Sequence, residues 1–279
     1  MTAKTWFITG ASSGFGRAFA EHALARGHNV VATARQPSTL EEIVAQAPER
    51  VLSCALDVTR PDDAQAAIDA AVARFGRIDV LINNAGYGVV GAFEETADSE
   101  MRALMETNFF GAMNVTRAAL PTLRAQRSGA VVNISSLGGQ LSFAGFSAYS
   151  ASKFAIEGVS EALAQELKPF DVKVLIVEPG QFRTNLGGAS LRHMPVMDTY
   201  RDVVGATRQF AHDMHGTQAG DPAKAAAAIE AALDAANTPL RLQLGADAVD
   251  AIRDHATTLL KDLDDWEALA RGTAFEPVA

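Results

Sequence analysis

Tyr149 and Lys153 lie four residues apart in the segment Tyr-Ser-Ala-Ser-Lys. On a helix this spacing puts both side chains on one face, one turn apart. A free tyrosine titrates at about pH 10, and a neighbouring cation favours the phenolate. We therefore expect Lys153 to lower the pKa of Tyr149 toward the range that suits general acid and base catalysis.

A glycine-rich turn near the N-terminus offers a second kind of chemistry. It runs from Thr9 to Gly16 and has glycines at positions 10, 14 and 16. Glycines there allow a tight turn and a close backbone approach to a pyrophosphate, while the N-terminus of the following helix attracts the anion. Because the spacing is G-x-x-x-G-x-G and not G-x-G-x-x-G, the turn by itself predicts only a nucleotide or another anion.

The residue that follows the second expected strand is Arg35. In NAD-binding folds an acidic residue about 20 positions beyond the glycines binds the ribose 2′-hydroxyl. This chain has no carboxylate there, and a guanidinium group can instead form paired hydrogen bonds with a 2′-phosphate. Arg35 therefore predicts NADP(H) as the cofactor. The alternative is a surface arginine without a ligand.

Short β-branched segments alternate with longer alanine-rich segments along most of the chain. Near-continuous apolar strands are typical of a parallel sheet that is covered on both faces. The alternation predicts an α/β fold, a doubly wound parallel sheet of the Rossmann type. We expect strands at 5–9, 29–34, 51–56, 80–83, 130–135, 172–178 and 240–244, and helices at 14–26, 61–75, 99–127, 149–168 and 221–236.

No linker rich in Pro, Gly or Ser divides the chain, so we expect residues 1–279 to form a single NAD(P)-binding domain. The alternation breaks at residues 186–220, which look irregular and which we interpret as an inserted substrate lid. Residues 247–271 carry an apolar residue every three or four positions, which predicts an amphipathic C-terminal helix. Such a helix most often packs on its own domain, and a subunit interface is the alternative. Three heptads are too few for an independent coiled coil.

Several further motifs stand in the order of a known family. Over residues 4–185 the sequence resembles the short-chain dehydrogenase/reductase family, in its compact single-domain branch. The motifs that carry the resemblance are the turn T-G-x-x-x-G-x-G from Thr9 to Gly16, Asp57, the stretch Asn83-Asn84-Ala85-Gly86, Asn108, Ser136, Tyr149 with Lys153, and Pro179-Gly180 with Thr184.

The resemblance implies a role for each of four residues. Tyr149 would protonate a carbonyl oxygen or remove a hydroxyl proton, and Ser136 would donate a hydrogen bond to the same oxygen. Lys153 would hold the nicotinamide ribose, and Asn108 would anchor a water that completes a proton relay. Ser135 is the rival of Ser136, but adjacent strand residues face opposite sides of a sheet, and only Ser136 has the family spacing.

The turn, the arginine and the resemblance together predict a cofactor site and a substrate site. The cofactor set is Gly10, Ser12, Ser13, Gly14, Phe15, Gly16, Arg35, Asp57, Val58, Asn84, Ala85, Gly86, Tyr149, Lys153, Pro179, Gly180 and Thr184. The substrate set is Gly138, Phe143, Phe146 and, from the lid, Met194 and Met197. Apolar side chains predict a hydrophobic ketone, aldehyde or secondary alcohol. Alternatively, the lid methionines only pack on the domain.

Composition excludes other classes of partner. Lys and Arg number 24 and Asp and Glu 33, a net charge of −9, so we expect no nucleic-acid partner. We expect no membrane span, because no run of 18 apolar residues occurs. The single cysteine, Cys54, and the lack of a signal peptide favour the cytoplasm. His212 and His215 lack a third ligand, so no metal is expected.

The leading interpretation is an NADP(H)-dependent oxidoreductase that interconverts a small carbonyl compound and an alcohol. The resemblance also implies a homodimer or a homotetramer. One alternative is a regulator or scaffold that binds NADP without turnover, although such a protein has no need of the serine, tyrosine and lysine together. Another is a sugar-nucleotide epimerase or dehydratase, which typically has a G-x-x-G-x-x-G turn and a longer C-terminal domain.

Overall fold

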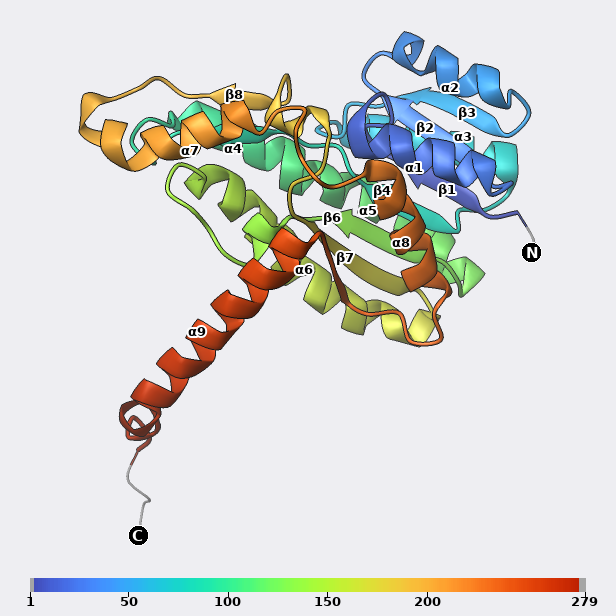
Figure 1. Ribbon diagram of the computed structural model, residues 1–279. Coiled ribbons are helices and arrows are strands. Elements are labelled where there is room, and N and C mark those ends of the chain that lie inside the picture. Colours follow the sequence, from blue (N-terminus) through green and yellow to red (C-terminus); the bar gives the residue numbers. More distant parts are fainter. Residues whose placement is uncertain (1–2, 276–279) are drawn as a thin grey trace.

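The computed structural model describes residues 3–275, and its core is a seven-stranded parallel sheet (Figure 1). The strand order is β3-β2-β1-β4-β6-β7-β9, and all neighbouring pairs are parallel. The chain thus has the predicted doubly wound α/β fold. The strands are β1 (Thr5–Ile8), β2 (Asn29–Ala34), β3 (Val51–Ala55), β4 (Val80–Asn83), β6 (Ala130–Ile134), β7 (Lys173–Pro179) and β9 (Arg241–Leu244).

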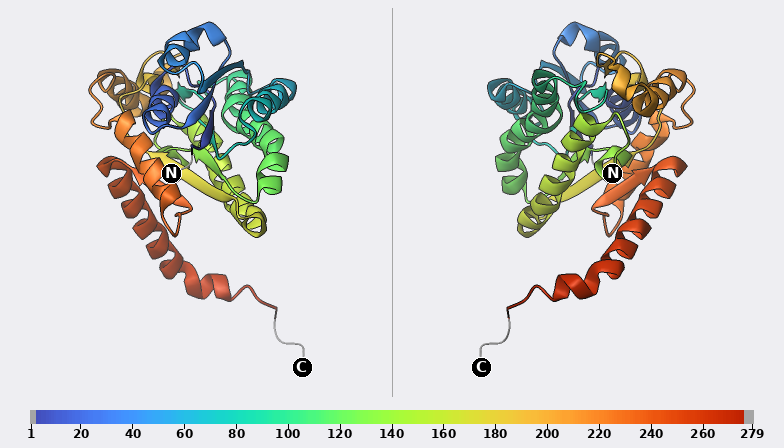
Figure 2. Two further views of the ribbon diagram at one scale, coloured as in Figure 1. Left: turned by 90° about the vertical axis from the view of Figure 1, so that its right-hand side faces the viewer. Right: turned by 90° about the vertical axis from the view of Figure 1, so that its left-hand side faces the viewer.

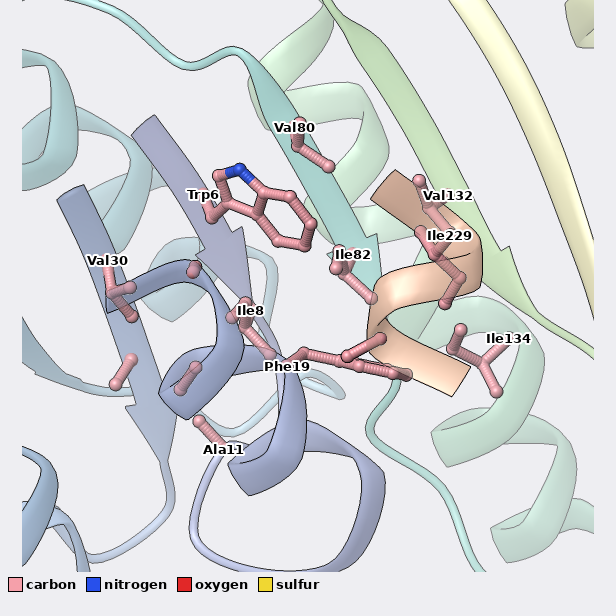
Figure 3. Close-up of a cluster of buried hydrophobic side chains, with 14 of the residues drawn as sticks. Trp6, Ile8, Ala11, Phe19, Val30, Val80, Ile82, Val132, Ile134 and Ile229 are labelled. Atoms are coloured by element: carbon pink, nitrogen blue, oxygen red, sulfur yellow. The ribbon is translucent and has the colours of Figure 1, made fainter. Parts of the chain in front are cut away.

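Helices cover both faces of this sheet because successive strand residues point to opposite sides. In β1, Trp6 and Ile8 pack in one apolar cluster with α1 and α8 (Figure 3). Phe7 packs in the other cluster with α3, α5 and α6. The helices are α1 (Gly14–Ala25), α2 (Glu41–Gln46), α3 (Pro61–Phe75), α4 (Asp98–Met105), α5 (Gly111–Gln126), α6 (Ser147–Leu167), α7 (Arg201–Asp213), α8 (Pro222–Asp234) and α9 (Ala246–Arg271).

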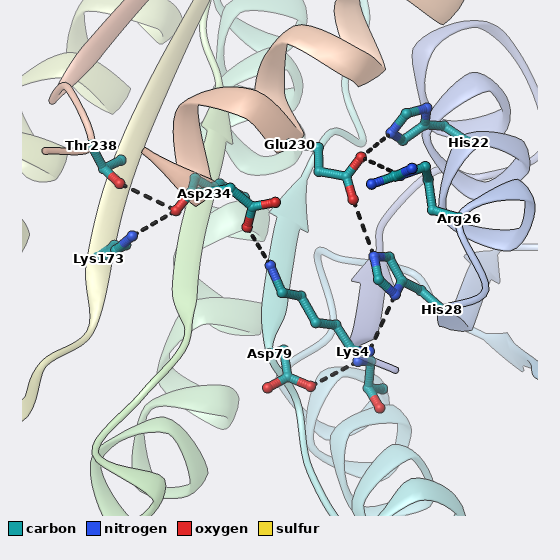
Figure 4. A network of polar contacts seen from close by, with 11 residues as sticks. Lys4, His22, Arg26, His28, Asp79, Lys173, Glu230, Asp234 and Thr238 are labelled. Atoms are coloured by element: carbon teal, nitrogen blue, oxygen red, sulfur yellow. Dashed lines mark hydrogen bonds and ion pairs between the residues drawn. The ribbon is translucent and has the colours of Figure 1, made fainter. Parts of the chain in front are cut away.

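A buried carboxylate fastens α8 to the opposite end of the chain (Figure 4). Glu230 accepts hydrogen bonds from His22 at 2.8 Å, Arg26 at 3.0 Å and His28 at 3.2 Å. Burial raises the pKa of Glu230, but its bonds to the two imidazoles and the nearby charges outweigh burial, so the pKa is lowered. The carboxylate therefore stays ionised and ties α8 to α1 and to the start of β2.

The parallel register brings the carboxyl ends of the strands to one edge of the sheet. The chain reverses its direction of travel across the sheet between β1 and β4, which are neighbours although they are not consecutive. Doubly wound sheets bind ligands in the crevice that such a switch opens. Strands β1, β4, β6 and β7 all end at this crevice, with Ile8, Asn83, Ile134 and Pro179 as their last residues.

Two segments differ in detail from the expected elements. The helix expected at 99–127 is divided into α4 and α5 by a π-helix, Glu106–Phe110. The segment 186–220, expected to be irregular, contains helix α7 and the short strand β8 (Leu191–His193), which pairs with β5 (Gly88–Val90) in a second, two-stranded sheet. That pairing attaches the segment to the domain beside the crevice.

Helix α9 departs most from expectation. It forms close to its predicted bounds, but the prediction that it packs on its own domain is wrong for most of its length. Only Ala248 near its start is buried, and Leu259, Leu263 and Trp266 are each more than half exposed. The helix points away from the rest of the molecule, so its outer half contacts no other described element (Figures 1 and 2).

Candidate active site

A cleft of about 1390 Å³ opens at the carboxyl edge of the sheet. This volume exceeds the range of about 300–1,000 Å³ that is usual for one small ligand, so the cleft has room for a dinucleotide and a substrate. It brings together residues that the sequence places up to 241 positions apart, between Gly10 and Ala251. Of the predicted cofactor set, its lining includes Gly10, Ser12, Ser13, Gly14, Phe15, Arg35, Asp57, Val58, Asn84, Ala85, Gly86, Tyr149, Lys153, Pro179, Gly180 and Thr184.

The glycine turn has a geometry that side chains would not allow. Gly10 and Gly14 have φ angles of +66° and +53°, in the left-handed region that favours glycine. A Cβ atom on Gly16 would lie 2.2 Å from the carbonyl oxygen of Gly10. Gly16 is absent from the cleft lining because its role is to let α1 pack against the turn, which leaves the helix N-terminus open to an anion.

Thr9 and Asn84 hold the turn in place. The Asn84 side-chain amide donates to the carbonyl oxygens of Thr9 at 2.9 Å and Gly10 at 3.2 Å. In return, the hydroxyl oxygen of Thr9 accepts the backbone N–H groups of Asn84 at 2.9 Å and Ala85 at 3.0 Å. These four bonds join the ends of β1 and β4 and make the crevice floor rigid.

Arg35 and Asp57 stand at the rim of the cleft, after β2 and β3. Hydrogen bonding from Thr59 is the main reason that the pKa of Asp57 is lowered, and the charge of Arg35 adds to it. The Arg35 side chain is exposed and forms no ion pair within residues 3–275. Its guanidinium group is therefore available to an anionic ligand.

Tyr149 and Lys153 lie one turn apart on α6, and both are buried. The Nζ atom of Lys153 donates a 2.8 Å hydrogen bond to the carbonyl oxygen of Ile134 and lies 5.7 Å from the centre of the Tyr149 ring. Burial lowers the pKa of Lys153 to about 8, although the nearby carboxylate of Glu157 opposes the shift.

The expectation that Lys153 lowers the pKa of Tyr149 is wrong in this structure. Burial raises the pKa of Tyr149, and a hydrogen bond with Ser136 offsets only part of that shift. A buried phenolate loses its hydration, and here that cost exceeds the benefit of the neighbouring polar groups. The phenol is thus held in its protonated form, ready to donate.

Ser135 and Ser136 follow β6 directly and face different surroundings. The Ser136 hydroxyl accepts the backbone N–H of Gly138 at 3.0 Å and lies on the Tyr149 side. Ser135 is buried, with its Oγ atom beside Gly139, and has no hydrogen-bond partner within residues 3–275. Ser136 is therefore the serine that can act together with Tyr149.

Asn108 lies behind the cleft, inside the π-helix between α4 and α5, and π-helical turns often occur at functional sites. Its side-chain amide donates to the Tyr87 carbonyl oxygen at 2.9 Å and to Ser152 Oγ at 3.1 Å, and its Oδ1 atom accepts the Tyr87 N–H at 3.0 Å. Both amide protons are in use. A water bound to Asn108 can therefore only donate a hydrogen bond, either to the side-chain oxygen or to the backbone carbonyl oxygen of this residue.

An acidic pair behind α6 was not foreseen. Glu157 lies one turn beyond Lys153, and Glu178 is fully buried at the end of β7. Arg241 lies between them, with Nε 3.0 Å from Glu157 and 3.3 Å from Glu178. Gln140, from the loop after Ser136, donates to both carboxylates at 3.1 and 2.9 Å. Only the topology could have revealed this group, because its members come from four separate segments.

The substrate side of the cleft is apolar, but it differs from the predicted set. Gly138, Phe143 and Phe146 line it, whereas Met194 and Met197 do not. Met194 is buried in a cluster with Tyr149, and Met197 is exposed outside the cleft. Other residues of segment 186–220 line the cleft in their place: Leu186, Leu191, Arg192, Phe210, Met214 and Gln218.

Metal sites and membrane-spanning helices are both absent from the part of the chain that the structure describes. Within residues 3–275, no group of three His, Cys, Asp or Glu side chains is placed to hold a metal ion. In the same range, no helix is both long enough and apolar enough to span a bilayer.

Comparison with known proteins agrees with this geometry. A family model described as short chain dehydrogenase matches residues 4–194. The protein "Oxidoreductase BOA17" of Botryotinia fuckeliana is 40% identical over 272 residues, which cover 97% of this chain and 99% of the relative. A crystal structure of a short-chain dehydrogenase from Streptomyces avermitilis is 53% identical, with a TM-score of 0.93 over 98% of this chain and 100% of the other.

A more distant structure shares the fold alone. It is a short chain dehydrogenase/reductase from Burkholderia phymatum in complex with NAD, 23% identical, with a TM-score of 0.80 over 99% of this chain and 98% of the other. The matched family model spans more than half of this chain, and the relative from Botryotinia fuckeliana matches nearly all of it. The chain therefore belongs to the short-chain dehydrogenase/reductase family and is an oxidoreductase of that type.

Proposed function

We propose that this chain is an NADP(H)-dependent oxidoreductase that interconverts a ketone or aldehyde and the matching alcohol. The observation that carries the proposal is the grouping of Ser136, Tyr149 and Lys153 in one cleft with the glycine turn. A regulator that only binds NADP needs the turn but not these three side chains. An epimerase or dehydratase of sugar nucleotides finds no support in the turn, which has the G-x-x-x-G-x-G spacing.

Each residue has a task in the proposed reaction. When bound, the nicotinamide cofactor supplies or accepts the hydride. Tyr149 gives its proton to the carbonyl oxygen during reduction and takes it back during oxidation, and its raised pKa suits the donor form. Ser136 donates a hydrogen bond to the same oxygen, where negative charge develops. Lys153 holds the ribose hydroxyls, and Asn108 anchors the water of a proton relay.

The preference for NADP(H) rests on Arg35. Its exposed guanidinium group stands after β2, where NAD-binding folds carry the carboxylate that binds the 2′-hydroxyl. A 2′-phosphate would pair with this cation, whereas a carboxylate at the same position would repel it. The Gly16 geometry and the open N-terminus of α1 fit the pyrophosphate of either dinucleotide.

The proposed substrate is a hydrophobic small molecule. Phe143, Phe146, Phe210 and Met214 line the cleft, and the cation that segment 186–220 adds to the lining, Arg192, is already paired with Glu100 at 3.1 Å. We further propose that residues 186–220 form a substrate lid and that residues 1–279 form a single NAD(P)-binding domain. We also propose a homodimer or homotetramer in the cytoplasm.

The test is the change Tyr149→Phe, which removes only the phenolic hydroxyl. NADPH oxidation is followed across a panel of aryl and long-chain ketones and aldehydes, and NADPH affinity is measured separately by calorimetry. We expect kcat to fall at least about 100-fold with NADPH affinity retained. Tyr200→Phe is the matched control, because that partly exposed tyrosine bonds Glu94 outside the cleft lining. Near-normal turnover by Tyr149→Phe would rule out the proposed acid.

A further inference from the structure

The outer part of α9 presents an apolar face that nothing within residues 3–275 covers. Every side chain from Ala256 to Arg271 is exposed, and five of them are large and apolar. This segment alone is about 24 Å long. Monomers rarely expose so large a contiguous apolar patch, and such patches mark interaction sites. The five large side chains are Leu259, Leu260, Leu263, Trp266 and Leu269, which are between 54% and 68% exposed.

The face is a continuous stripe with heptad spacing. Ile252, Ala256, Leu259, Leu263 and Trp266 are separated by alternating steps of four and three residues, as in the seam of a two-helix pair. Acidic residues outnumber basic ones on α9 by seven to three, and they lie mostly on the opposite face. A helix with a negatively charged polar face is poorly suited to an anionic bilayer surface. The stripe is better suited to another protein helix.

The sizes of the stripe residues match a second α9 that runs in the opposite direction. When Leu259 faces Leu263 of the other copy, the antiparallel register also sets Ala256 against Trp266. Small residues then meet large ones, which is how a helix interface fills its space. In the same register Arg253 and Glu267 flank the seam on opposite copies, so an opposite charge pair closes each end.

A parallel pair lacks this match. It would set Trp266 against Trp266 and Ala256 against Ala256, so one layer is overfilled and the other is left open. It would also place Glu267 of each copy on the same end of the pair, without Arg253 nearby. The composition of the stripe therefore distinguishes the two directions, although its periodicity is the same in both.

The area available is adequate for association. Leu259, Leu263 and Trp266 lie in the seam, and Leu260 and Leu269 flank it on either side. At roughly 100 Å² for each of these five side chains, two copies would remove at most about 1,000 Å² from water, the lower bound for a specific interface. We infer that α9 is a self-association arm, which pairs with α9 of a second copy of this chain in antiparallel register, Leu259 against Leu263. This inference concerns the assembly and does not depend on the proposed reaction.

The first test measures molar mass by sedimentation of the full chain over a range of concentrations. Leu263→Asp places a charge in the seam, and Thr257→Asp adds the same charge on the opposite face as the matched control. We expect Leu263→Asp to halve the mass of the assembly and to raise its dissociation constant at least tenfold, while Thr257→Asp leaves both unchanged. Both side chains are exposed, so neither change disturbs the folded domain. Equal masses for all three proteins would overturn the inference.

The second test reads the direction of the pair in a Cys54→Ser background. Leu259→Cys and Leu263→Cys are oxidised separately and as an equal mixture. The antiparallel register predicts disulfide-linked dimers mainly in the mixture, because residue 259 faces residue 263. Efficient cross-linking of each variant alone would show a parallel pair and would contradict the proposed register. If, instead, the chain bound phosphatidylcholine vesicles through Leu263 without any change in mass, a lipid surface and not a second copy would be the partner.

Discussion

The ammonium group of Lys153 is joined to the carbonyl oxygen of Ile134 by a hydrogen bond of 2.8 Å. Ile134 is the last residue of β6, and the two serines follow it directly. The bond therefore couples the helix that carries Tyr149 to the strand end that carries Ser136. It holds Tyr149, the proposed proton donor, at a fixed distance from Ser136, which would donate a hydrogen bond to the developing oxyanion, before any substrate binds.

Lys153→Met should reduce kcat at least about 100-fold and also make the folded protein more stable at neutral pH. Burial lowers the pKa of Lys153 from 10.5 to about 8, so the folded state releases this proton more readily than the unfolded state. The buried charge therefore lowers the free energy of unfolding of the wild-type protein. This penalty is absent above pH 10.5 and is complete once the pH has fallen through 8.

The advantage of Lys153→Met, after subtraction of the lost hydrogen bond to Ile134, should therefore be about 2 kcal/mol below pH 8. Above pH 10.5 the burial penalty is absent and only the loss of that bond remains, so the variant should be slightly less stable than wild type there. Urea unfolding at pH 7 and pH 10.5 measures it. The control is Lys168→Met, because Lys168 is exposed and directly follows α6. The stability of this control relative to wild type should not change with pH in this way. A variant that is less stable than wild type at pH 7 would contradict the burial argument.

Arg35→Ala should weaken NADPH use without a matching effect on NADH. The loss of a charge-assisted pair with a 2′-phosphate costs about 1.5–3 kcal/mol, which corresponds to a rise of about 10- to 100-fold in KM for NADPH. The control is Arg60→Ala, because Arg60 is also an exposed arginine whose charge reaches Asp57. Steady-state kinetics with both cofactors decide the matter. Equal losses for NADPH and NADH would mean that Arg35 does not read the 2′-phosphate.

Glu178→Gln should stabilise the protein above neutral pH. Burial is the first cause that raises the pKa of Glu178, and Glu157 adds to it, so the value rises from 4.5 to about 7. The folded state thus holds a proton that the unfolded state releases. The stability from this group is present below pH 4.5 and is lost as the pH rises through 7.

Chemical unfolding at pH 4.5 and pH 8 should show no gain and a gain of about 2 kcal/mol, respectively. Glu161→Gln is the control, since Glu161 also pairs with Arg241 but is half exposed. The gain would be absent if water entered the buried pair and hydrated both carboxylates.

Gly16→Ala should abolish tight cofactor binding and destabilise the fold by about 1–3 kcal/mol. The added methyl carbon would meet the Gly10 carbonyl oxygen at 2.2 Å, and this backbone atom cannot move without opening the turn. Gly158→Ala is the control, because its Cβ would meet no atom within 4 Å and alanine is the better helix former there. Thermal unfolding with and without NADPH measures both effects. A Gly16→Ala protein that is stabilised by NADPH as strongly as wild type would refute the packing role.

Local patterns in the sequence were sufficient for much of the fold and the catalytic group. The strands follow from apolar runs, and the neighbourhood of Tyr149 and Lys153 follows from helical spacing, since both depend on residues that are close in the chain. Such relationships survive in any tertiary arrangement because backbone geometry alone imposes them. The choice of Ser136 came instead from the family resemblance, and its place beside Tyr149 depends on how the loop after β6 packs against α6.

Relationships between distant segments depended on the tertiary structure. The pKa of Tyr149 is raised because its side chain is buried. Segment 186–220 presents Met214 and not Met194 to the cleft, because Met194 packs in a buried cluster with Tyr149. The periodicity of α9 announced an apolar stripe, but no local rule states what a stripe packs against. Only the direction in which α9 leaves the sheet placed its outer half away from its own domain, since burial is a property of the whole fold.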